Sequence, residues 1–341
     1  MPDNFPTPSN SLILRHPENP ILSRDDVPYP STLVFNAGVT HYSGKYVCVF
    51  RNDFGEWNNP EFKGTNLGLA TSNDGIHWSV DSKPIWTLED VMRDTEAFYP
   101  HFSPNSEILR AYDPRLTVID DQCYMCFALD TNHGLRGGIA KTTDFHHFDV
   151  LSLSTPDNRN LVLFPEKING KYLRLERPMP VYSRHMQTRF DIWCSDSKDL
   201  KYWGNPQGVL WIEQVPFAND KIGPSAPPIK TKYGWLTLFH AVDIDPKRGK
   251  NGWEDNWQKR YSVGIMLLDL EDPTKIIGLS KEPLMIPEYS YELNGFRNNV
   301  LFPGGMILEE SSEVKIYYGA SDTVECLAIA DVNDLLSFCL P

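Results

Sequence analysis

The sequence predicts an all-β protein, a five-bladed β-propeller with a site in its central funnel. A strand–turn–strand pattern recurs five times, with repeats that start near residues 35, 113, 160, 221 and 300. Most repeats are followed by a segment similar to Gly-x-Ala-x-Ser-x-Asp-x-x-x-Trp, as at residues 68–78. Repeated β-units of this kind are typical of propellers, in which each blade packs on its neighbours. Five repeats therefore predict five blades.

Length and composition agree with this fold. The chain has 341 residues, which is long for one compact domain but ordinary for a propeller. Its 27 prolines and 22 glycines suit a protein built from many strands and turns. We expect a single propeller domain over residues 1–341, with a short N-terminal extension up to about residue 20.

The charge of the chain restricts its partners. With 32 basic and 45 acidic residues, the net charge is −13, which argues against a nucleic-acid partner. A local cationic pocket for a small anion stays compatible with this balance. The N-terminus lacks a basic and an apolar targeting region, and no apolar run approaches membrane-spanning length. We therefore expect no membrane partner and a cytoplasmic location.

Most of the six cysteines lie inside apolar strand patterns, where a free cysteine behaves as a small hydrophobic residue. Cys123 and Cys126 have the spacing of half a zinc site, but no second ligand pair accompanies them. In an extended strand these two side chains also point to opposite faces. We interpret them as structural and expect no metal site.

The first three repeats each pair two strands around a polar turn and end in a polar residue. In the first repeat, Asn36 precedes the turn at residues 43–44 and the return strand ends at Arg51. The second repeat runs from Asp113 through residues 120–121 to Asp130. The third runs from residues 159–164 through 169–170 to 177. Antiparallel pairing places the two ends of each repeat together at the open end of a hairpin.

The last two repeats follow the same plan. In the fourth, Lys221 precedes the turn at residues 232–234, and the return strand reaches His240. In the fifth, residues 298–299 precede the first strand and the return ends at Asp322. If these hairpins are the inner strands of five blades, their open ends converge on one funnel. Strand ends are often polar, but arginine, lysine, histidine and aspartate at these ends favour a functional site.

The predicted funnel contains five cationic side chains, and such a cluster in an acidic protein suits an anion such as phosphate. They are Arg51, Arg159, Arg177, Lys221 and His240. The alternative is that some of them form salt bridges with neighbouring acids such as Asp130, Glu176 and Asp220.

Two carboxylates, Asp113 and Asp322, are best placed for chemistry. Proline follows Asp113 and favours an extended backbone there. A single acid beside an anion-binding group fits acid-assisted glycosyl transfer to phosphate. Phosphate is already a nucleophile, whereas attack by water normally needs a second carboxylate as a base.

Tryptophans in two loops give a third candidate feature. Trp57, Trp253 and Trp257 lie in insertions that leave the hairpin ends, where they could stack on a sugar ring. Packing between loops or at a subunit interface explains them equally well. Four other tryptophans fall within the strand pattern and are expected in the core: Trp78, Trp193, Trp203 and Trp235.

Over nearly its whole length the sequence resembles the β-mannoside phosphorylases of glycoside hydrolase family 130. Several blocks in the same order carry this resemblance: residues 35–39, 50–51, 112–115, 157–160, 162–165, 174–178, 221–223, 234–240 and 317–323. The resemblance implies a five-bladed propeller that performs inverting, reversible phosphorolysis of β-mannosides and releases α-mannose 1-phosphate. Inorganic phosphate would be the co-substrate, and no cofactor is expected.

The resemblance also implies roles for individual residues. Asp113 would be the proton donor, acting through the mannosyl 3-hydroxyl. The positions that match the phosphate-binding set are Arg159, Arg177, Lys221 and His240. The positions that match sugar-binding residues are Asn36, Arg51, Tyr112 and Asp322.

Two other functions remain to be compared with this one. A hydrolytic β-mannosidase of the same fold would need a second carboxylate that activates water, and neither Asp130 nor Glu176 shows that role in the sequence. A non-catalytic carbohydrate-binding propeller would bind sugar without turnover. The linkage (β-1,2 or β-1,4) and the acceptor sugar are open, and the chain could also form a homo-oligomer.

Overall fold

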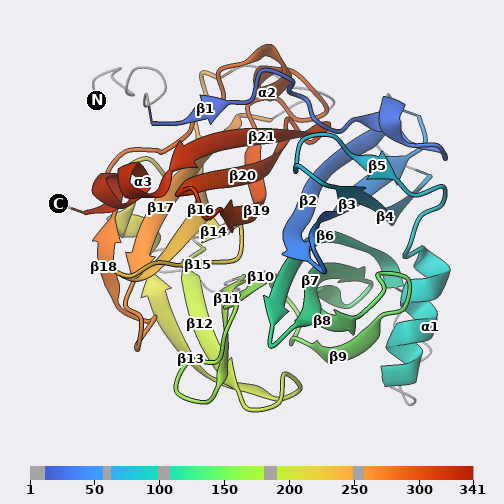
Figure 1. Cartoon of the computed structure of the whole chain (residues 1–341), viewed down its shortest axis with the longest axis horizontal. Coiled ribbons are helices and arrows are strands. Elements are labelled where there is room, and N and C mark those ends of the chain that lie inside the picture. The colour runs from blue at the N-terminus through green and yellow to red at the C-terminus, as the bar shows by residue number, and fades with distance from the viewer. Residues whose placement is uncertain (1–11, 57–62, 99–107, 180–189, 249–256, 341) are drawn as a thin grey trace.

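The computed structural model describes residues 12–56, 63–98, 108–179, 190–248 and 257–340. Their strands form five antiparallel sheets, and Figure 1 shows these sheets arranged in a ring. Strands that follow one another in the chain are mostly neighbours in their sheet. The five-bladed propeller predicted from the repeats is confirmed.

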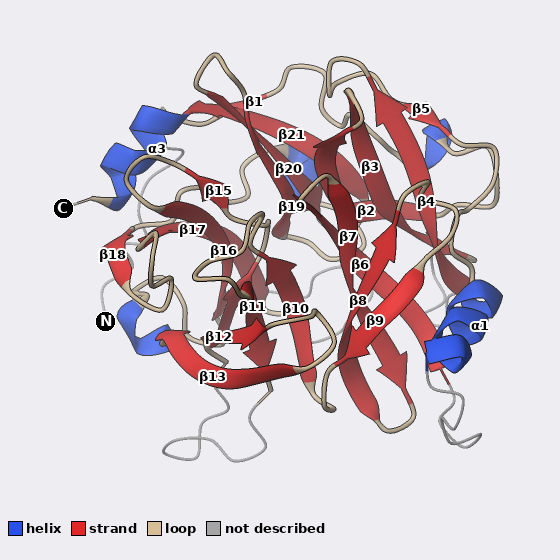
Figure 2. Ribbon diagram, turned by 60° about the horizontal axis from the view of Figure 1, so that its bottom comes forward, coloured by secondary structure: helices blue, strands red, loops and turns tan. Residues whose placement is uncertain are grey.

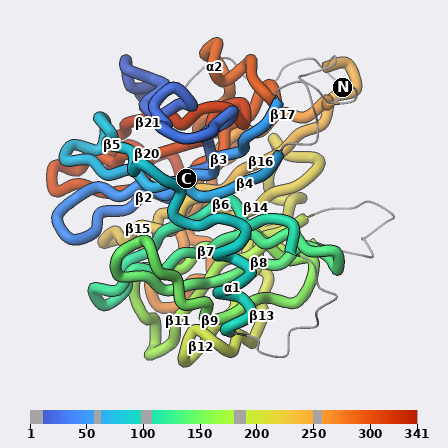
Figure 3. The backbone as a smooth tube through the Cα atoms, turned by 90° about the vertical axis from the view of Figure 1, so that its right-hand side faces the viewer, coloured from blue at the N-terminus to red at the C-terminus, as the bar shows by residue number. Residues whose placement is uncertain are grey.

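Blades 1 and 2 are four-stranded meanders. Blade 1 consists of β2 (Leu33–Tyr42), β3 (Lys45–Phe54), β4 (Gly64–Ser72) and β5 (Ser79–Val80). Blade 2 consists of β6 (Ile108–Ile119), β7 (Gln122–Thr131), β8 (Gly134–Thr142) and β9 (Asp149–Leu153). Figure 3 views the ring from the side of these two blades, which are coloured blue to green.

Blades 3 and 4 continue the ring. Blade 3 consists of β10 (Asn158–Leu163), β11 (Tyr172–Pro178), β12 (Ile192–Ser197) and β13 (Trp203–Leu210). Blade 4 consists of β14 (Lys221–Pro224), β16 (Trp235–Ile244), β17 (Lys259–Leu268) and β18 (Ile276–Leu279), with β15 (Ile229–Lys230) added to β16.

Blade 5 joins the two ends of the chain. It consists of β19 (Leu301–Leu308), β20 (Glu313–Ala320), β21 (Val324–Asp331) and the N-terminal strand β1 (Leu14–Arg15). In β1, Leu14 lies opposite Ile329 of β21. Part of the segment that we expected to be an N-terminal extension is therefore the outermost strand of the last blade.

The hairpin turns explain why the repeats could be recognised in the sequence. Three of the inner hairpins turn on two consecutive residues with positive φ, at Ser43–Gly44, Asp120–Asp121 and Asn169–Gly170. This is the geometry of a type I′ turn, whose twist matches the twist of the flanking strands. Small, Asx and glycine residues tolerate this conformation best, so the turn positions carry a local sequence signal.

The hydrophobic core is divided among the interfaces between neighbouring blades. Val49 of blade 1 packs in one cluster with Met125 of blade 2, for example, and Leu175 of blade 3 shares a cluster with Phe239 of blade 4. Similar clusters join blades 2 and 3, blades 4 and 5, and blades 5 and 1. Each blade therefore packs on both of its neighbours, and these interfaces hold the ring together.

The described residues form three short helices, and Figure 2 shows the first and the last of them at the outside of the ring. They are α1 (Leu88–Phe98), α2 (Ser290–Leu293) and α3 (Val332–Cys339), and two three-residue 3₁₀ turns lie at Arg24–Asp26 and Ile212–Gln214. Before α1, Thr87 and Asp90 exchange side-chain to backbone hydrogen bonds in a capping box. No helix in the described parts of the chain is both long and apolar enough to cross a membrane.

The first strand of each blade lies nearest the axis of the ring: β2, β6, β10, β14 and β19 (Figure 1). These strands are buried over most of their length, as shown by β2, in which Leu33–Val39 is buried throughout. Several polar side chains on them, such as those of Asn36, Asp113 and Arg159, line the central cavity. The inner strands thus position the candidate site.

Candidate active site

A cavity of about 470 Å³ opens at the centre of the ring. All nine residues that the sequence predicted for the site line this cavity: Asn36, Arg51, Tyr112, Asp113, Arg159, Arg177, Lys221, His240 and Asp322. They come from all five blades. The predicted convergence of the hairpins on one funnel is therefore confirmed.

Bulges in three inner strands turn polar side chains into the cavity. The pairing register shifts after Phe35 in β2, after Tyr112 in β6 and after Arg159 in β10. At these points Asn36, Asp113 and Asn160 have φ values of 52°, 53° and 58°. The extended backbone that we expected at Asp113 is therefore wrong, because the bulge places this residue in the left-handed region. Asparagine and aspartate adopt this left-handed conformation at lower cost than other residues with a side chain. A bulge with a left-handed asparagine or aspartate therefore occurs at equivalent positions in three blades.

Two of the predicted boundaries differ from the structure. β6 begins at Ile108, upstream of Asp113, because the bulge at Asp113 interrupts the strand without ending it. His240 lies inside β16, which continues to Ile244, and it faces Gly223 of β14. These residues reach the cavity from within strands.

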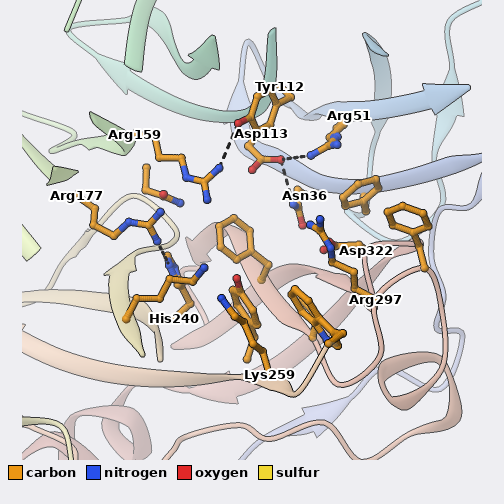
Figure 4. Close-up of a pocket in the computed structure, with 18 of the residues that line it drawn as sticks. Asn36, Arg51, Tyr112, Asp113, Arg159, Arg177, His240, Lys259, Arg297 and Asp322 are labelled. Atoms are coloured by element: carbon orange, nitrogen blue, oxygen red, sulfur yellow. Dashed lines mark hydrogen bonds and ion pairs between the residues drawn. The ribbon is translucent and has the colours of Figure 1, made fainter. Parts of the chain in front are cut away.

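Asp113 is held by groups from blade 1. Its Oδ1 accepts a hydrogen bond of 3.0 Å from Nδ2 of Asn36 and lies 3.3 Å from Nη1 of Arg51 (Figure 4). Burial acts to raise the pKa of Asp113, but the charges of Arg51 and Arg115 and the bond from Asn36 outweigh it, so the pKa is below its ordinary value. In the free protein Asp113 is therefore a carboxylate.

Asp322 is the second carboxylate of the cavity. It follows β20 with a φ of 49°, and its Oδ2 lies 3.2 Å from Nη1 of Arg297. Burial raises the pKa of Asp322 and the negative charge of Asp113 adds to this effect, although Arg297 and Arg51 oppose it. The two acids of the cavity are thus shifted in opposite directions.

Several cations around the cavity are neutralised by an acid. Arg51 lies 2.6 Å from Asp53, and Lys259 lies 3.1 Å from Asp220. Arg110 and Arg297 are paired in the same way with other carboxylates. Arg51 is one of the five cationic residues predicted in the funnel, and for this residue the salt-bridge alternative is correct.

Arg159 and Arg177 are different, because no carboxylate of the described residues lies within salt-bridge distance of either. The buried Nε atom of each has no hydrogen-bond partner in the described parts of the chain. Lys221 lies near them, 4.0 Å from Asp220, which also pairs with Lys259. Burial and then the charge of Arg177 lower the pKa of Lys221 well below its usual value. This uncompensated positive charge favours an anion in the cavity.

His240 lines the cavity and also contacts Arg177. Its Nε2 lies 3.0 Å from Nη1 of Arg177 and its Nδ1 lies 3.3 Å from Oγ of Ser225. Because a guanidinium can only donate, Nε2 must be the acceptor and Nδ1 carries the proton. Burial and the charges of Arg177 and Lys221 lower the pKa of His240, in agreement with a neutral ring.

Aromatic rings line another part of the cavity. Trp257 stacks on Tyr261, with ring centroids 5.9 Å apart, and its Nε1 donates to the carbonyl of Asn298. Trp257 therefore packs against neighbouring segments and also lines the cavity, whereas its stacking on a sugar ring stays a prediction. Trp57 and Trp253 lie outside the described residues. Of the tryptophans expected in the core, Trp235 is fully buried, whereas Trp78, Trp193 and Trp203 are only half-buried.

Further residues that the sequence did not single out also line the cavity: Phe35, Arg110, Asn160, Lys259, Tyr261, Phe296, Arg297, Val300 and Phe302. Asn160 carried a signal that could have identified it, because it occupies the place in its repeat that Asn36 and Asp113 occupy in theirs. Arg297 and Lys259 lie in segments with no such repeat position.

The acids considered as a second catalytic carboxylate have other partners. Glu176 lies 2.8 Å from Nη2 of Arg174 and accepts from Asn158. Asp130 binds Arg110 and Tyr112. Neither is among the residues that line the cavity.

The six cysteines are free and buried. Cys123 packs in the cluster between blades 1 and 2, whereas Cys126 packs between blades 2 and 3, so the two side chains do point to opposite faces. Among the described residues, no group of three or more histidine, cysteine, aspartate or glutamate side chains could hold a metal ion.

Comparison with known proteins identifies relatives along the whole propeller. The family model of glycoside hydrolase family 130, described as β-1,4-mannooligosaccharide phosphorylase, matches residues 14–340. The β-1,4-mannooligosaccharide phosphorylase of Ruminococcus albus is 32% identical over 339 residues, which are 98% of this chain and 92% of the relative. The 1,2-β-oligomannan phosphorylase of Thermoanaerobacter sp. is 32% identical over 309 residues, with 89% and 91% covered.

A solved structure agrees with these sequences. The β-1,2-mannobiose phosphorylase of Listeria innocua, in complex with β-1,2-mannobiose, superposes with a TM-score of 0.78. It is 26% identical, and the match covers 96% of this chain and 99% of that one. With the family model matched over almost the whole propeller, the chain belongs to glycoside hydrolase family 130.

Proposed function

We propose that this protein is an inverting β-mannoside phosphorylase. It would cleave a β-mannoside with inorganic phosphate and release α-mannose 1-phosphate and a shortened sugar. The observation that carries this proposal is the presence, in one cavity, of the carboxylate of Asp113 and of two arginines, Arg159 and Arg177, that have no acid partner among the described residues. The relatives that the chain matches are named as mannoside phosphorylases.

In this reaction a phosphate oxygen attacks the anomeric carbon from the face opposite the glycosidic oxygen. The carbon–oxygen bond to the leaving sugar breaks, and that oxygen takes a proton. Arg159, Arg177 and Lys221 would bind the phosphate oxygens, with His240 holding Arg177. Fixed cations at this place also stabilise the charge that moves during the transfer.

We assign Asp113 as the proton donor, acting through the 3-hydroxyl of the mannosyl unit. Its carboxylate form in the free protein suits the reverse reaction, in which it must accept a proton. A bound phosphate brings negative charge beside Arg159, one of the groups that lower the pKa of Asp113, and so favours the protonated acid. Asn36, Arg51, Tyr112 and Asp322 would contact the sugars.

The hydrolytic alternative is less well supported by the geometry. Water would need a base, but the carboxylate of Asp322, the other acid described in the cavity, is engaged by Arg297 at 3.2 Å. Arg159 and Arg177 have no acid partner among the described residues and lie in the same cavity as the carboxylate of Asp113. This is the arrangement expected for an anionic nucleophile.

Reverse synthesis tests the function and reads the linkage. We expect the protein to release phosphate from α-mannose 1-phosphate when mannose, glucose, N-acetylglucosamine or a mannobiose is the acceptor. The relatives named above act on β-1,4 and β-1,2 linkages, and the linkage of the new product decides between the two. Failure to release phosphate with every acceptor would contradict the proposal.

A further inference from the structure

A chain of contacts leads from outside the cavity to Arg159. Nη1 of Arg159 donates a hydrogen bond of 3.2 Å to Oη of Tyr112. Oη of Tyr112 in turn donates a bond of 2.8 Å to Oδ1 of Asp130. Figure 4 shows the first of these contacts at the edge of the cavity. Asp130 itself does not line the cavity.

The direction of these bonds is set by chemistry. A guanidinium can only donate and a carboxylate can only accept, so the hydroxyl of Tyr112 must give its proton to Asp130 and a lone pair to Arg159. Burial and then the negative charge of Asp130 raise the pKa of Tyr112, against the effect of Arg159, and this keeps the hydroxyl protonated.

The carboxylate of Asp130 is itself firmly placed. Its Oδ2 accepts a bond of 2.7 Å from Nε of Arg110, which is its cross-strand partner on β6. The guanidinium of Arg110 also lies 4.5 Å from the centre of the Tyr112 ring, and that of Arg51 lies 4.9 Å from it. Tyr112 therefore has little freedom to turn its hydroxyl elsewhere.

Among the described residues, Tyr112 is the one hydrogen-bond partner of the Arg159 side chain. Its Nε is buried and has no hydrogen-bond partner in the described parts of the chain. A direct pair with an acid would neutralise Arg159, whereas the neutral oxygen of Tyr112 fixes one nitrogen and leaves the positive charge in place. Orientation without neutralisation is what an anion-binding arginine needs.

We propose that Asp130 is a positioning residue for phosphate: by binding the proton of Tyr112, it directs the oxygen of Tyr112 to Arg159 and so orients that guanidinium toward the cavity. This inference rests on the proposed function, in which Arg159 binds phosphate. It gives Tyr112 a task in addition to the sugar contact expected from the sequence. It also assigns a function to an acid that touches neither substrate.

The test compares Asp130→Asn with wild type and with a matched control. An asparagine amide can donate as well as accept, so it no longer forces the Tyr112 proton away from Arg159. We expect the Kd for inorganic phosphate, measured by titration calorimetry, to rise about tenfold, the size of a lost bond to a charged group. The KM for phosphate should rise with it, while the KM for the mannoside stays unchanged.

Asp196→Asn is the control. Asp196 also pairs with a cation, Lys171, at 2.8 Å, and its side chain is 25% exposed against 23% for Asp130. It lies on β12, outside the cavity. This variant should bind phosphate as wild type does.

Tyr112→Phe removes the hydroxyl that links Asp130 to Arg159. This variant replaces Asp130→Asn in the test if a thermal melt shows that Asp130→Asn does not fold. It should weaken phosphate binding, and adding Asp130→Asn to it should weaken binding no further, because both changes break one chain of contacts. If the losses of phosphate affinity in the two single variants add up in the double variant, or if the Kd of Asp130→Asn is unchanged, the inference about Asp130 is overturned. The proposed function would stand in either case. If the wild-type protein binds no phosphate, the proposed function fails and the inference fails with it.

Discussion

At the scale of single residues, the two acids of the cavity have distinct environments. Asp113 is surrounded by Asn36, Arg51 and nearby arginines that lower its pKa, whereas burial raises the pKa of Asp322. Opposite shifts in one site indicate that the two carboxyl groups have different tasks. Comparing their asparagine variants can therefore assign the proton donor.

We expect Asp113→Asn to lower kcat on a β-mannobiose by about 10²- to 10⁴-fold, the range of general acid catalysis, with the melting temperature preserved. On 2,4-dinitrophenyl β-mannoside, whose leaving group needs no proton, the same variant should retain most of its activity. Asp322→Asn should be impaired on both substrates. Recovery on the aryl mannoside by Asp322→Asn, but not by Asp113→Asn, would assign the acid to Asp322 instead.

The lowered pKa of Lys221 predicts how phosphate binding depends on pH. A lysine is charged below its pKa, and burial together with Arg177 lowers the pKa of Lys221, so its charge is lost at a lower pH than that of an ordinary lysine. Phosphate affinity should therefore fall as the pH rises into the alkaline range. Lys221→Arg keeps its charge and should move this fall to higher pH.

Calorimetric Kd values for phosphate across neutral and alkaline pH check this prediction. The ionisation of phosphate itself affects both proteins equally, so the difference between the two profiles reports Lys221. Parallel profiles would show that Lys221 does not titrate in this range.

At the scale of structural elements, the bulges in β2, β6 and β10 couple backbone conformation to chemistry. Asn36 shows this most clearly, because its left-handed backbone places its amide on Asp113. Replacing Asn36 by glycine or by alanine removes the amide in both cases. Only alanine then retains a Cβ in the left-handed conformation.

We expect the two variants to lose similar activity but to differ in stability. Asn36→Ala should be less stable than Asn36→Gly by about 1 kcal/mol, the cost of the left-handed conformation for a residue with Cβ. Denaturant unfolding measures the difference. If alanine is as stable as glycine at this position, the bulge relaxes and does not impose the geometry.

The elements also explain what the sequence could and could not predict. The hairpins were predictable because turns such as Asn169–Gly170 and their flanking strands carry local signals. Asp113 and Arg177 could be placed in the funnel because the hairpin geometry brings repeat ends together. The partner of Arg297 and the position of β1 could not be predicted, because each depends on packing between segments far apart in the chain.

At the scale of the whole molecule, the ring closes where β1 meets β21. Arg15 of β1 contributes a buried ion pair, with its Nε 3.0 Å from Oε1 of Glu292, and donates to the carbonyl of Ile286. The side chains of Arg15 and Glu292 are 2% and 0% exposed. The closure thus includes the buried charge of Glu292, which is costly without its partner Arg15.

Arg15→Ala should lower the free energy of unfolding by about 3–5 kcal/mol, because it leaves the charge of Glu292 buried without its partner. Arg24→Ala is a suitable control, since Arg24 pairs with Asp25 on the surface and such pairs contribute about 0–1 kcal/mol. Denaturant unfolding of both variants is the measurement. Equal stabilities would contradict a role for Arg15 in closing the ring.

Phosphorolysis in the cavity predicts a defined outcome when phosphate is limiting. The protein is incubated with excess β-mannobiose of the preferred linkage, and ³¹P NMR follows the phosphate. We predict that every mannosyl unit released appears as α-mannose 1-phosphate and that net turnover stops as the reaction reaches equilibrium with the phosphate supplied. Continued release of free mannose from the mannobiose after phosphate is consumed would contradict the account.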